Sequence, residues 1–290
     1  MNPTVRRCAV LTIALPLLLG GSCQPKKPDP TFLGKTQITA ALHNDLPGMS
    51  YEENYQRSGL DWLVANQVRR GLKLKAISPV NTSSEGRVPA LTGGGVDIVI
   101  ASFSITPSRM KEIDFAGPYL TTRQGFLVGK DSARIRSLED LESKRVCTWE
   151  GTTSDEALQD LKHIGVQPVT LADASDCIDE LKAGQVDAIS TDQSILYGFA
   201  GLYADDGLRV VPGLTIGAPQ HYGVGLPKGH REDCRRLRDF LKEYVKSNEW
   251  IKDIETSLPE IPRAEPGWIS DYKPSDSSID ARSCRDESSS

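Results

Sequence analysis

Three features that would direct the chain to a membrane, a metal or a nucleic acid are missing. No internal apolar run approaches the roughly 18 residues that a membrane-spanning helix needs. No CxxC pair occurs and the four His are scattered, which argues against a zinc site. The net charge is −5 and no dense Lys/Arg stripe occurs, so we expect no nucleic-acid surface. With 25% charged and 38% hydrophobic residues, the composition is that of an ordinary globular protein, for which we expect no cofactor.

The beginning of the chain differs from the rest. Arg6 and Arg7 precede a short apolar stretch and three small residues that end at Cys23. This order predicts an export signal over residues 1–22. A Cys directly after small residues is similar to the lipobox of bacterial lipoproteins, so Cys23 is the expected lipid anchor, with plain signal cleavage as the alternative. The Pro- and Lys-rich residues 23–35 predict a tether.

The cysteines indicate disulfides. Of the six, Cys8 would leave with the signal and Cys23 would carry lipid. An even number then remains in an exported chain, which favours disulfide bonds. These four allow three pairings: Cys147, Cys177, Cys234 and Cys284.

One stretch has the form of an anion site. Residues 96–100 form a short apolar, β-branched run that is typical of a buried parallel strand. Thr106 and Pro107 then predict a helix start, with Arg109 in its first turn. Free backbone N–H groups, the helix dipole and a guanidinium fork would all face one carboxylate or phosphate. The alternative is an ordinary strand–helix corner whose Arg is solvated.

A second copy of this pattern favours the binding interpretation. The motif Leu91-x-x-Gly94-x-Val96-Asp97 recurs ninety positions later as Leu181-x-x-Gly184-x-Val186-Asp187. Aligning the two copies places Ser102 over Asp192. Because ligands in open α/β sheets bind beyond the carboxyl ends of strands, two similar units would form a two-lobed clamp.

The loop at residues 151–156 is a second strand–loop–helix corner of the anion-binding kind. It follows the predicted strand 145–149 and contains Thr152, Thr153 and Ser154. Ser154 is the predicted N-cap, because acidic residues follow it in the first helical turn.

Several motifs together resemble one protein family. The chain is similar from about residue 36 to 255 to the family 3 extracellular solute-binding proteins, the amino-acid receptors of bacterial ABC importers. The resemblance rests on Ser-Ile-Thr-Pro-Ser-Arg (104–109), Ile-Asp-Phe-Ala-Gly-Pro-Tyr (113–119), Gly-Thr-Thr-Ser (151–154) and Val-Asp-Ala (186–188) with Asp192.

The resemblance implies an α/β, type II periplasmic-binding-protein fold. Each of its two lobes would contain a mixed, mostly parallel sheet flanked by helices, with the ligand cleft between them. Lobe 1 would comprise residues 36–122 and 222–263, and lobe 2 residues 123–221. The Ser- and Asp-rich residues 264–290 lack periodicity and predict a polar, largely disordered tail.

The resemblance also implies a ligand site. Arg109 would pair with the α-carboxylate of an amino acid, helped by Ser104 and Thr153, and Asp192 would hold the α-ammonium. Ser102 would add a carbonyl or hydroxyl. The expected set is completed by Thr106 and Thr152.

The side chain of the ligand would meet a second arginine. Arg87 stands where some glutamate and aspartate receptors hold the side-chain carboxylate, with Ser84 nearby; the alternative is a solvated Arg at a helix start. The first loop lacks the aromatic motif that stacks on the ligand in the family, and Tyr51 is the candidate replacement.

The glutamate-binding branch is the most similar, and its equivalent cysteines imply a Cys147–Cys177 disulfide. Cys234 and Cys284 would form the remaining pair. We therefore expect a monomeric receptor for glutamate or aspartate that serves ABC permease subunits and is lipid-anchored at the outer face of the cell membrane. The alternatives are an enzyme on the same fold, for which His43, Glu150 and His221 are unpaired acid–base candidates, and a sensing module for a signalling partner.

Overall fold

The computed structural model describes residues 31–132 and 134–285. The predicted export signal, Cys23 and most of the predicted tether lie outside the described residues. The strands are β1 (Gln37–Leu42), β2 (Asp45–Leu46), β3 (Ser50–Glu53), β4 (Gln56–Ser58), β5 (Ala76–Asn81), β6 (Ile98–Val99), β7 (Ile113–Val128), β8 (Arg145–Trp149), β9 (Gln167–Leu171), β10 (Ala188–Asp192), β11 (Arg209–Val210) and β12 (Ile216–Pro227).

Helices separate most of these strands. The α-helices are α1 (Leu60–Gly71), α2 (Arg87–Thr92), α3 (Pro107–Glu112), α4 (Thr153–Asp160), α5 (Ala174–Lys182), α6 (Gln193–Leu202), α7 (Arg231–Lys246), α8 (Asn248–Ser257), α9 (Glu260–Ala264), α10 (Trp268–Tyr272) and α11 (Asp276–Arg282). Three short 3₁₀ helices are η1 (Lys130–Ser132), η2 (Glu139–Leu141) and η3 (Leu161–Ile164).

One mixed sheet runs through both lobes, in the order β5-β1-β6-β12-β7-β10-β8-β9, with β11 beside β7. Its two ends, β5-β1-β6 and β10-β8-β9, are parallel. The middle is antiparallel, because the long strands β7 and β12 pair with each other from one lobe into the other. A separate sheet, β2-β3-β4, lies in the first lobe.

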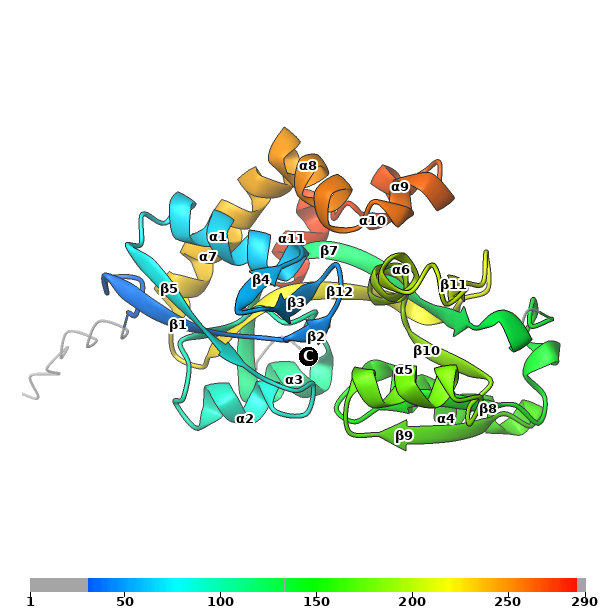
Figure 1. Cartoon of the computed structure of the whole chain (residues 1–290). Coiled ribbons are helices and arrows are strands. Elements are labelled where there is room, and N and C mark those ends of the chain that lie inside the picture. Colours follow the sequence, from blue (N-terminus) through cyan, green and yellow to red (C-terminus); the bar gives the residue numbers. More distant parts are fainter. Residues whose placement is uncertain (1–30, 133, 286–290) are drawn as a thin grey trace, which may run out of the picture.

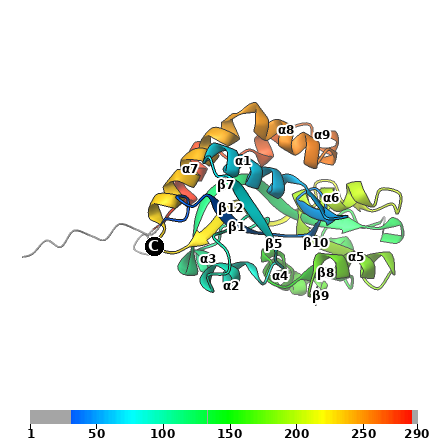
Figure 2. The same cartoon turned by 60° about the vertical axis from the view of Figure 1, so that its left-hand side comes forward.

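We call the part around β5-β1-β6 the first lobe and the part around β10-β8-β9 the second. Figure 1 shows α1, α7 and α8 above the first-lobe sheet and α2 and α3 below it, while α4 and α5 flank the strands of the second lobe. The view in Figure 2 keeps these layers. Each sheet end is thus covered on both faces, as the apolar strand runs require.

The sequence repeat corresponds to two equivalent turns. Gly94 and Gly184 both have left-handed backbones, with φ of 70° and 69°. In the first copy the Asp97 carboxylate accepts a hydrogen bond from the backbone N–H of Thr39, within β1. In the second, Asp187 accepts one from the N–H of Arg145, at the start of β8. Each Asp therefore ties its turn to the neighbouring parallel strand.

Both disulfides named from the sequence are present. Cys147–Cys177 joins β8 to α5, and Cys234–Cys284 joins α7 to the end of the described chain. Closing a loop of 30 residues contributes about 2–4 kcal/mol to stability.

The predicted disordered tail is wrong for its described part, residues 264–285. That part contains α10 and α11, and Trp268, Tyr272 and Ile279 are buried. Trp268 stacks on Trp250 of α8 at 5.8 Å. Helices of five and seven residues are too short to show a hydrophobic periodicity in the sequence. The Ser- and Asp-rich composition therefore predicted disorder, although three apolar residues of this segment pack into the core.

The tether also ends earlier than predicted. Phe32 and Leu33 are buried, and the backbone N–H of Phe32 donates to the carboxylate of Asp233 in α7. Two apolar residues inside a Pro- and Lys-rich stretch were enough to place residues 31–35 on the first lobe.

Candidate functional site

Seven of the eight predicted ligand residues line one cavity between the lobes: Arg87, Ser102, Ser104, Arg109, Thr152, Thr153 and Asp192. Ser102 follows β6 and Asp192 ends β10, so the two repeats do meet at the carboxyl ends of their strands. The eighth, Thr106, does not line this cavity. Its hydroxyl accepts the backbone N–H of Arg109 and caps α3, at the outer mouth of the cleft.

Arg109 is held by carbonyl groups and by an aromatic ring. Its Nη1 donates to the Ser104 carbonyl and its Nη2 to the Gly151 carbonyl, both at 2.8 Å. The guanidinium lies 4.9 Å from the centre of the Phe103 ring. A guanidinium has five N–H donors. Among the described residues no carboxylate forms an ion pair with Arg109, so three of its donors remain for a ligand.

Arg87 is more deeply buried and more fully bonded. Its side chain donates to the carbonyls of Ser84, Ala101, Ser102 and Gly151. These bonds leave one N–H, on Nη2. Burial, and the neighbouring charge of Arg109, lower the pKa of Arg87 to about 9. The structure thus contradicts the solvated alternative, since Arg87 is 3% exposed.

Asp192 supplies the opposite charge. One carboxylate oxygen, Oδ2, accepts a hydrogen bond from the hydroxyl of Tyr222, and the other, Oδ1, is buried without a hydrogen-bond partner in the part of the chain that the structure describes. Burial raises the pKa of Asp192 to about 6, against the attraction of Arg87 and Arg109. A buried acceptor without a donor is costly unless a ligand supplies one.

Ser102 is locked in place. Its backbone has a φ of 46°, and both its N–H and its hydroxyl donate to the buried carboxylate of Asp61. The Tyr119 hydroxyl donates to the other oxygen of Asp61. The Ser102 hydroxyl is therefore engaged within the protein, while its carbonyl faces Arg87.

The second-lobe corner differs in one detail from the sequence prediction. Thr152 is the N-cap of α4, because its hydroxyl accepts the N–H of Asp155, whereas Ser154 lies inside the helix. The Thr153 hydroxyl donates to Gln220 of β12 and accepts from Gln124 of β7. The start of α4 is thereby bonded to both strands that connect the lobes.

Comparison with known proteins identifies the family. Residues 38–256 match the bacterial extracellular solute-binding proteins, family 3. The chain belongs to this family. It is 35% identical to the glutamate-binding protein GluB of Corynebacterium glutamicum over 77% of this chain and 79% of that protein. It is 31% identical to the glutamine-binding protein of Geobacillus stearothermophilus over 70% of this chain and 77% of that protein.

A solved structure agrees on the fold. An ancestral arginine-binding protein bound to glutamine superposes with a TM-score of 0.70 and 28% identity, covering 77% of this chain and 98% of that one. The fold is the type II periplasmic-binding-protein fold, as predicted.

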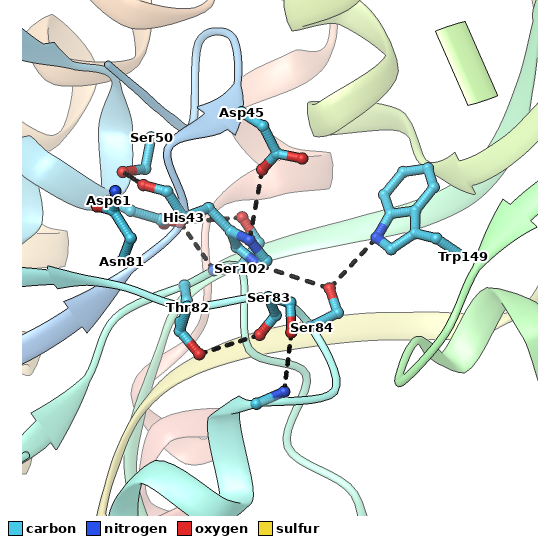
Figure 3. A network of polar contacts seen from close by, with 12 residues as sticks. His43, Asp45, Ser50, Asp61, Asn81, Thr82, Ser83, Ser84, Ser102 and Trp149 are labelled. Carbon is cyan, nitrogen blue, oxygen red and sulfur yellow. Dashed lines mark hydrogen bonds and ion pairs between the residues drawn. The ribbon is translucent and has the colours of Figure 1, made fainter. Parts of the chain in front are cut away.

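Four cavity residues of this family 3 protein escaped the sequence analysis: Leu46, Trp149, Thr191 and Ile195. His43 also lines the cavity, but the sequence had indicated it only as an acid–base candidate. Figure 3 shows Trp149 pointing from the second lobe to Ser84 of the first, where its Nε1 donates to the hydroxyl at 3.2 Å. Trp149 supplies the aromatic wall, and Tyr51 does not line the cavity. Trp149 stands at the carboxyl end of the predicted strand 145–149, and this position was the available signal. Ser102 and Asp192 were identified because they too stand at or after the carboxyl ends of strands.

The acid–base candidates do not converge. Burial lowers the pKa of His43 to about 3, so its ring is neutral. His221 faces the Thr121 hydroxyl, and Glu150 is exposed. Within the described ranges no three His, Cys, Asp or Glu side chains are arranged to hold a metal ion. No helix in that part of the chain is both long and apolar enough to span a bilayer.

Proposed function

We propose that this protein is an extracytoplasmic receptor that binds an amino acid between its lobes and delivers it to an ABC importer. One observation carries the proposal: among the described residues, a single cavity holds two guanidinium groups without a carboxylate partner and one carboxylate oxygen without a donor. An amino-acid zwitterion completes all of these charges at once, and buried charges require such pairing.

The roles follow from the donors that are left. Arg109, with three remaining N–H groups, pairs with the α-carboxylate in a bidentate manner. The buried Oδ1 of Asp192 accepts from the α-ammonium. The loop at Gly151–Thr153 brings the start of α4 to the same anion, where backbone N–H groups are available.

The proposed ligand is acidic, glutamate before aspartate. Arg87 lies in the same cavity and keeps one N–H for a second carboxylate, and the relative GluB is named for glutamate. The net charge is −5, and removal of residues 1–22 takes away two more positive charges, those of Arg6 and Arg7. The electric field of the whole molecule therefore repels an anion, so a local cation must attract it.

The same proposal places the protein outside the cell. Cys23, after removal of residues 1–22, carries the lipid and anchors a monomer to the outer face of the membrane beside its permease subunits. No catalytic step is assigned, because His43, Glu150 and His221 are not brought together.

Arg87→Leu tests the acidic ligand. We expect calorimetry to show that wild type binds glutamate more tightly than glutamine, because glutamine leaves the guanidinium without its counter-charge. The variant loses glutamate affinity far more than glutamine affinity. The ratio of the two affinities is the readout, since loss of the four carbonyl contacts of Arg87 weakens both ligands alike. Wild type that prefers glutamine, or a ratio unchanged in Arg87→Leu, contradicts the acidic assignment.

A further inference from the structure

We propose that Glu265 is a positioning residue for the ligand site. Residues 257–285, which we call the C-terminal brace, are fixed to the first lobe, and through Glu265 they hold helix α6 of the second lobe in the closed arrangement. This inference rests on the proposed function, because closure matters only if a ligand is held between the lobes. The brace lies beyond residues 38–256, which match the family, so membership of the family does not explain it.

The brace is fastened to the first lobe. The Cys234–Cys284 disulfide joins its end to α7. The Ser283 hydroxyl donates to the Gly117 carbonyl at 2.9 Å and accepts from the Gly117 N–H at 3.0 Å, at the first-lobe end of β7. Trp268 stacks on a tryptophan of α8. These contacts make the brace a part of the first lobe.

A hydrogen bond joins the brace to the second lobe. The Tyr197 hydroxyl, on α6, donates to Oε1 of Glu265 at 2.7 Å. The Tyr272 hydroxyl, within the brace, donates to the same oxygen at 3.2 Å. Burial, and then the Glu265 carboxylate, raise the pKa of Tyr197, so its hydroxyl keeps its proton and remains a donor.

Helix α6 belongs to the second lobe and leads directly to the ligand site. It lies between β10 and β11, and its N-cap is Asp192, the residue assigned to the α-ammonium. Ile195, in the first turn of the helix, lines the ligand cavity. A contact that fixes α6 therefore also fixes the carboxylate that the ligand needs.

The brace meets α6 over a small area. Both cartoons place α9 beside α6 (Figures 1 and 2). A Cβ on Gly201 would lie 3.4 Å from the Glu260 side chain, so the two helices approach each other there. Next to Tyr197 and Glu265 the surfaces separate around a cavity of about 750 Å³. Surfaces that face each other across a gap lose their dispersion contacts, so the hydrogen bond supplies much of the attachment.

A loop of the first lobe meets the same helix. A Cβ on Gly48 would lie 3.2 Å from the Cα of Gly198 in α6 and 2.9 Å from the carbonyl oxygen of Ser257, where the brace begins. Helix α6 thus contacts the first lobe through both this loop and the brace. A rotation of the second lobe away from the first must break these contacts, and the Tyr197–Glu265 hydrogen bond with them.

Stopped-flow dissociation of L-glutamate from the mature protein tests the proposal. Tyr197→Phe removes only the hydroxyl and is expected to raise the dissociation rate roughly two- to tenfold, the equivalent of one hydrogen bond of about 0.5–1.5 kcal/mol, with an unchanged association rate. Glu265→Ala has the same effect, whereas Glu265→Gln keeps an acceptor oxygen for Tyr197 and retains the ligand nearly as wild type does.

Tyr272→Phe is the matched control. It also removes a hydroxyl from Oε1 of Glu265, but one that lies within the brace and spans no lobes, so the dissociation rate stays within twofold of wild type. Equal rates in wild type and Tyr197→Phe overturn the brace and leave the receptor proposal intact. Equal acceleration in Tyr197→Phe and Tyr272→Phe also overturns it, because the effect would then follow from a general loosening of the segment.

A ligand-free measurement separates this inference from the proposed function. If wild type binds no glutamate, the acidic-ligand proposal fails, and small-angle X-ray scattering of the ligand-free proteins decides the brace. A larger radius of gyration in Tyr197→Phe than in wild type and Tyr272→Phe supports it. Equal radii in the three proteins overturn it.

Discussion

At the scale of single residues, the site is an incomplete set of charges. Arg109 and Arg87 share the Gly151 carbonyl as an acceptor, and Asp192 is held by the Tyr222 hydroxyl with one oxygen unused. A carbonyl dipole offsets only part of the cost of two buried cations. The free energy of ligand binding therefore comes largely from completing charges that the fold has already buried.

The carboxylate of Asp192 gives this site a pH dependence. The pKa of Asp192 is about 6 because of burial, and only its ionised form accepts an ammonium. The ligand and the proton compete, so affinity is full above pH 6 and falls as the pH decreases through 6, by at most about tenfold per unit. Calorimetry with glutamate at pH 7.5 and 5.0 measures the effect.

Asp192→Asn is the matched variant for this measurement. It binds weakly at pH 7.5 and loses the pH dependence that belongs to this carboxylate. A wild-type affinity that is constant from pH 7.5 to 5.0 would contradict the assignment of Asp192 to the ammonium.

At the scale of elements, the closed cleft depends on a turn that only glycine permits. Gly151, between β8 and α4, has a φ of 72°, and a Cβ there would lie 2.5 Å from backbone atoms of Glu85 in the first lobe. This loop also provides the carbonyl that both arginines share. The two lobes thus approach each other backbone to backbone beside the ligand.

Gly151→Ala is expected to prevent full closure and to weaken glutamate binding by more than tenfold. Gly184→Ala is the control, because Gly184 has a φ of 69° in the same lobe with nothing within 4 Å of the added Cβ. Both variants suffer the same backbone strain, so only the interlobe clash separates their affinities in calorimetry. Equal affinities for the two variants would show that the Gly151 loop does not close on the first lobe.

The sequence predicted these elements where the signal was local. Neighbouring residues were enough to predict the two Gly-x-Val-Asp turns, the helix cap at Thr106 and the strand before Gly151. They were not enough to predict the partners that fix the site: Tyr222 reaches Asp192, and Asp61 reaches Ser102, only because strands distant in the chain become neighbours.

At the scale of the whole molecule, two strands and a C-terminal segment connect the lobes. β7 and β12 make the two lobes one sheet, and the lobe boundaries expected from the sequence, 122/123 and 221/222, fall inside these two strands. Residues 257–285 lie beyond the region shared with the family and contact α6, β7 and α7. In Figure 1 these orange and red helices lie above β7 and α6. The side of the molecule that carries the connecting strands is therefore covered in part by residues 264–285, which composition had assigned to disorder.

The central claim is that one cavity recognises both charges of an amino acid together with a second carboxylate. Titration calorimetry of the mature wild-type protein with glutamate, glutarate and γ-aminobutyrate tests it most directly. Glutarate lacks only the ammonium that Asp192 is assigned, and γ-aminobutyrate lacks only the carboxylate that Arg109 is assigned. Each omission strands a buried charge and is expected to weaken binding by about 30- to 4,000-fold, the equivalent of about 2–5 kcal/mol. Binding of either analogue within threefold of glutamate would contradict the account.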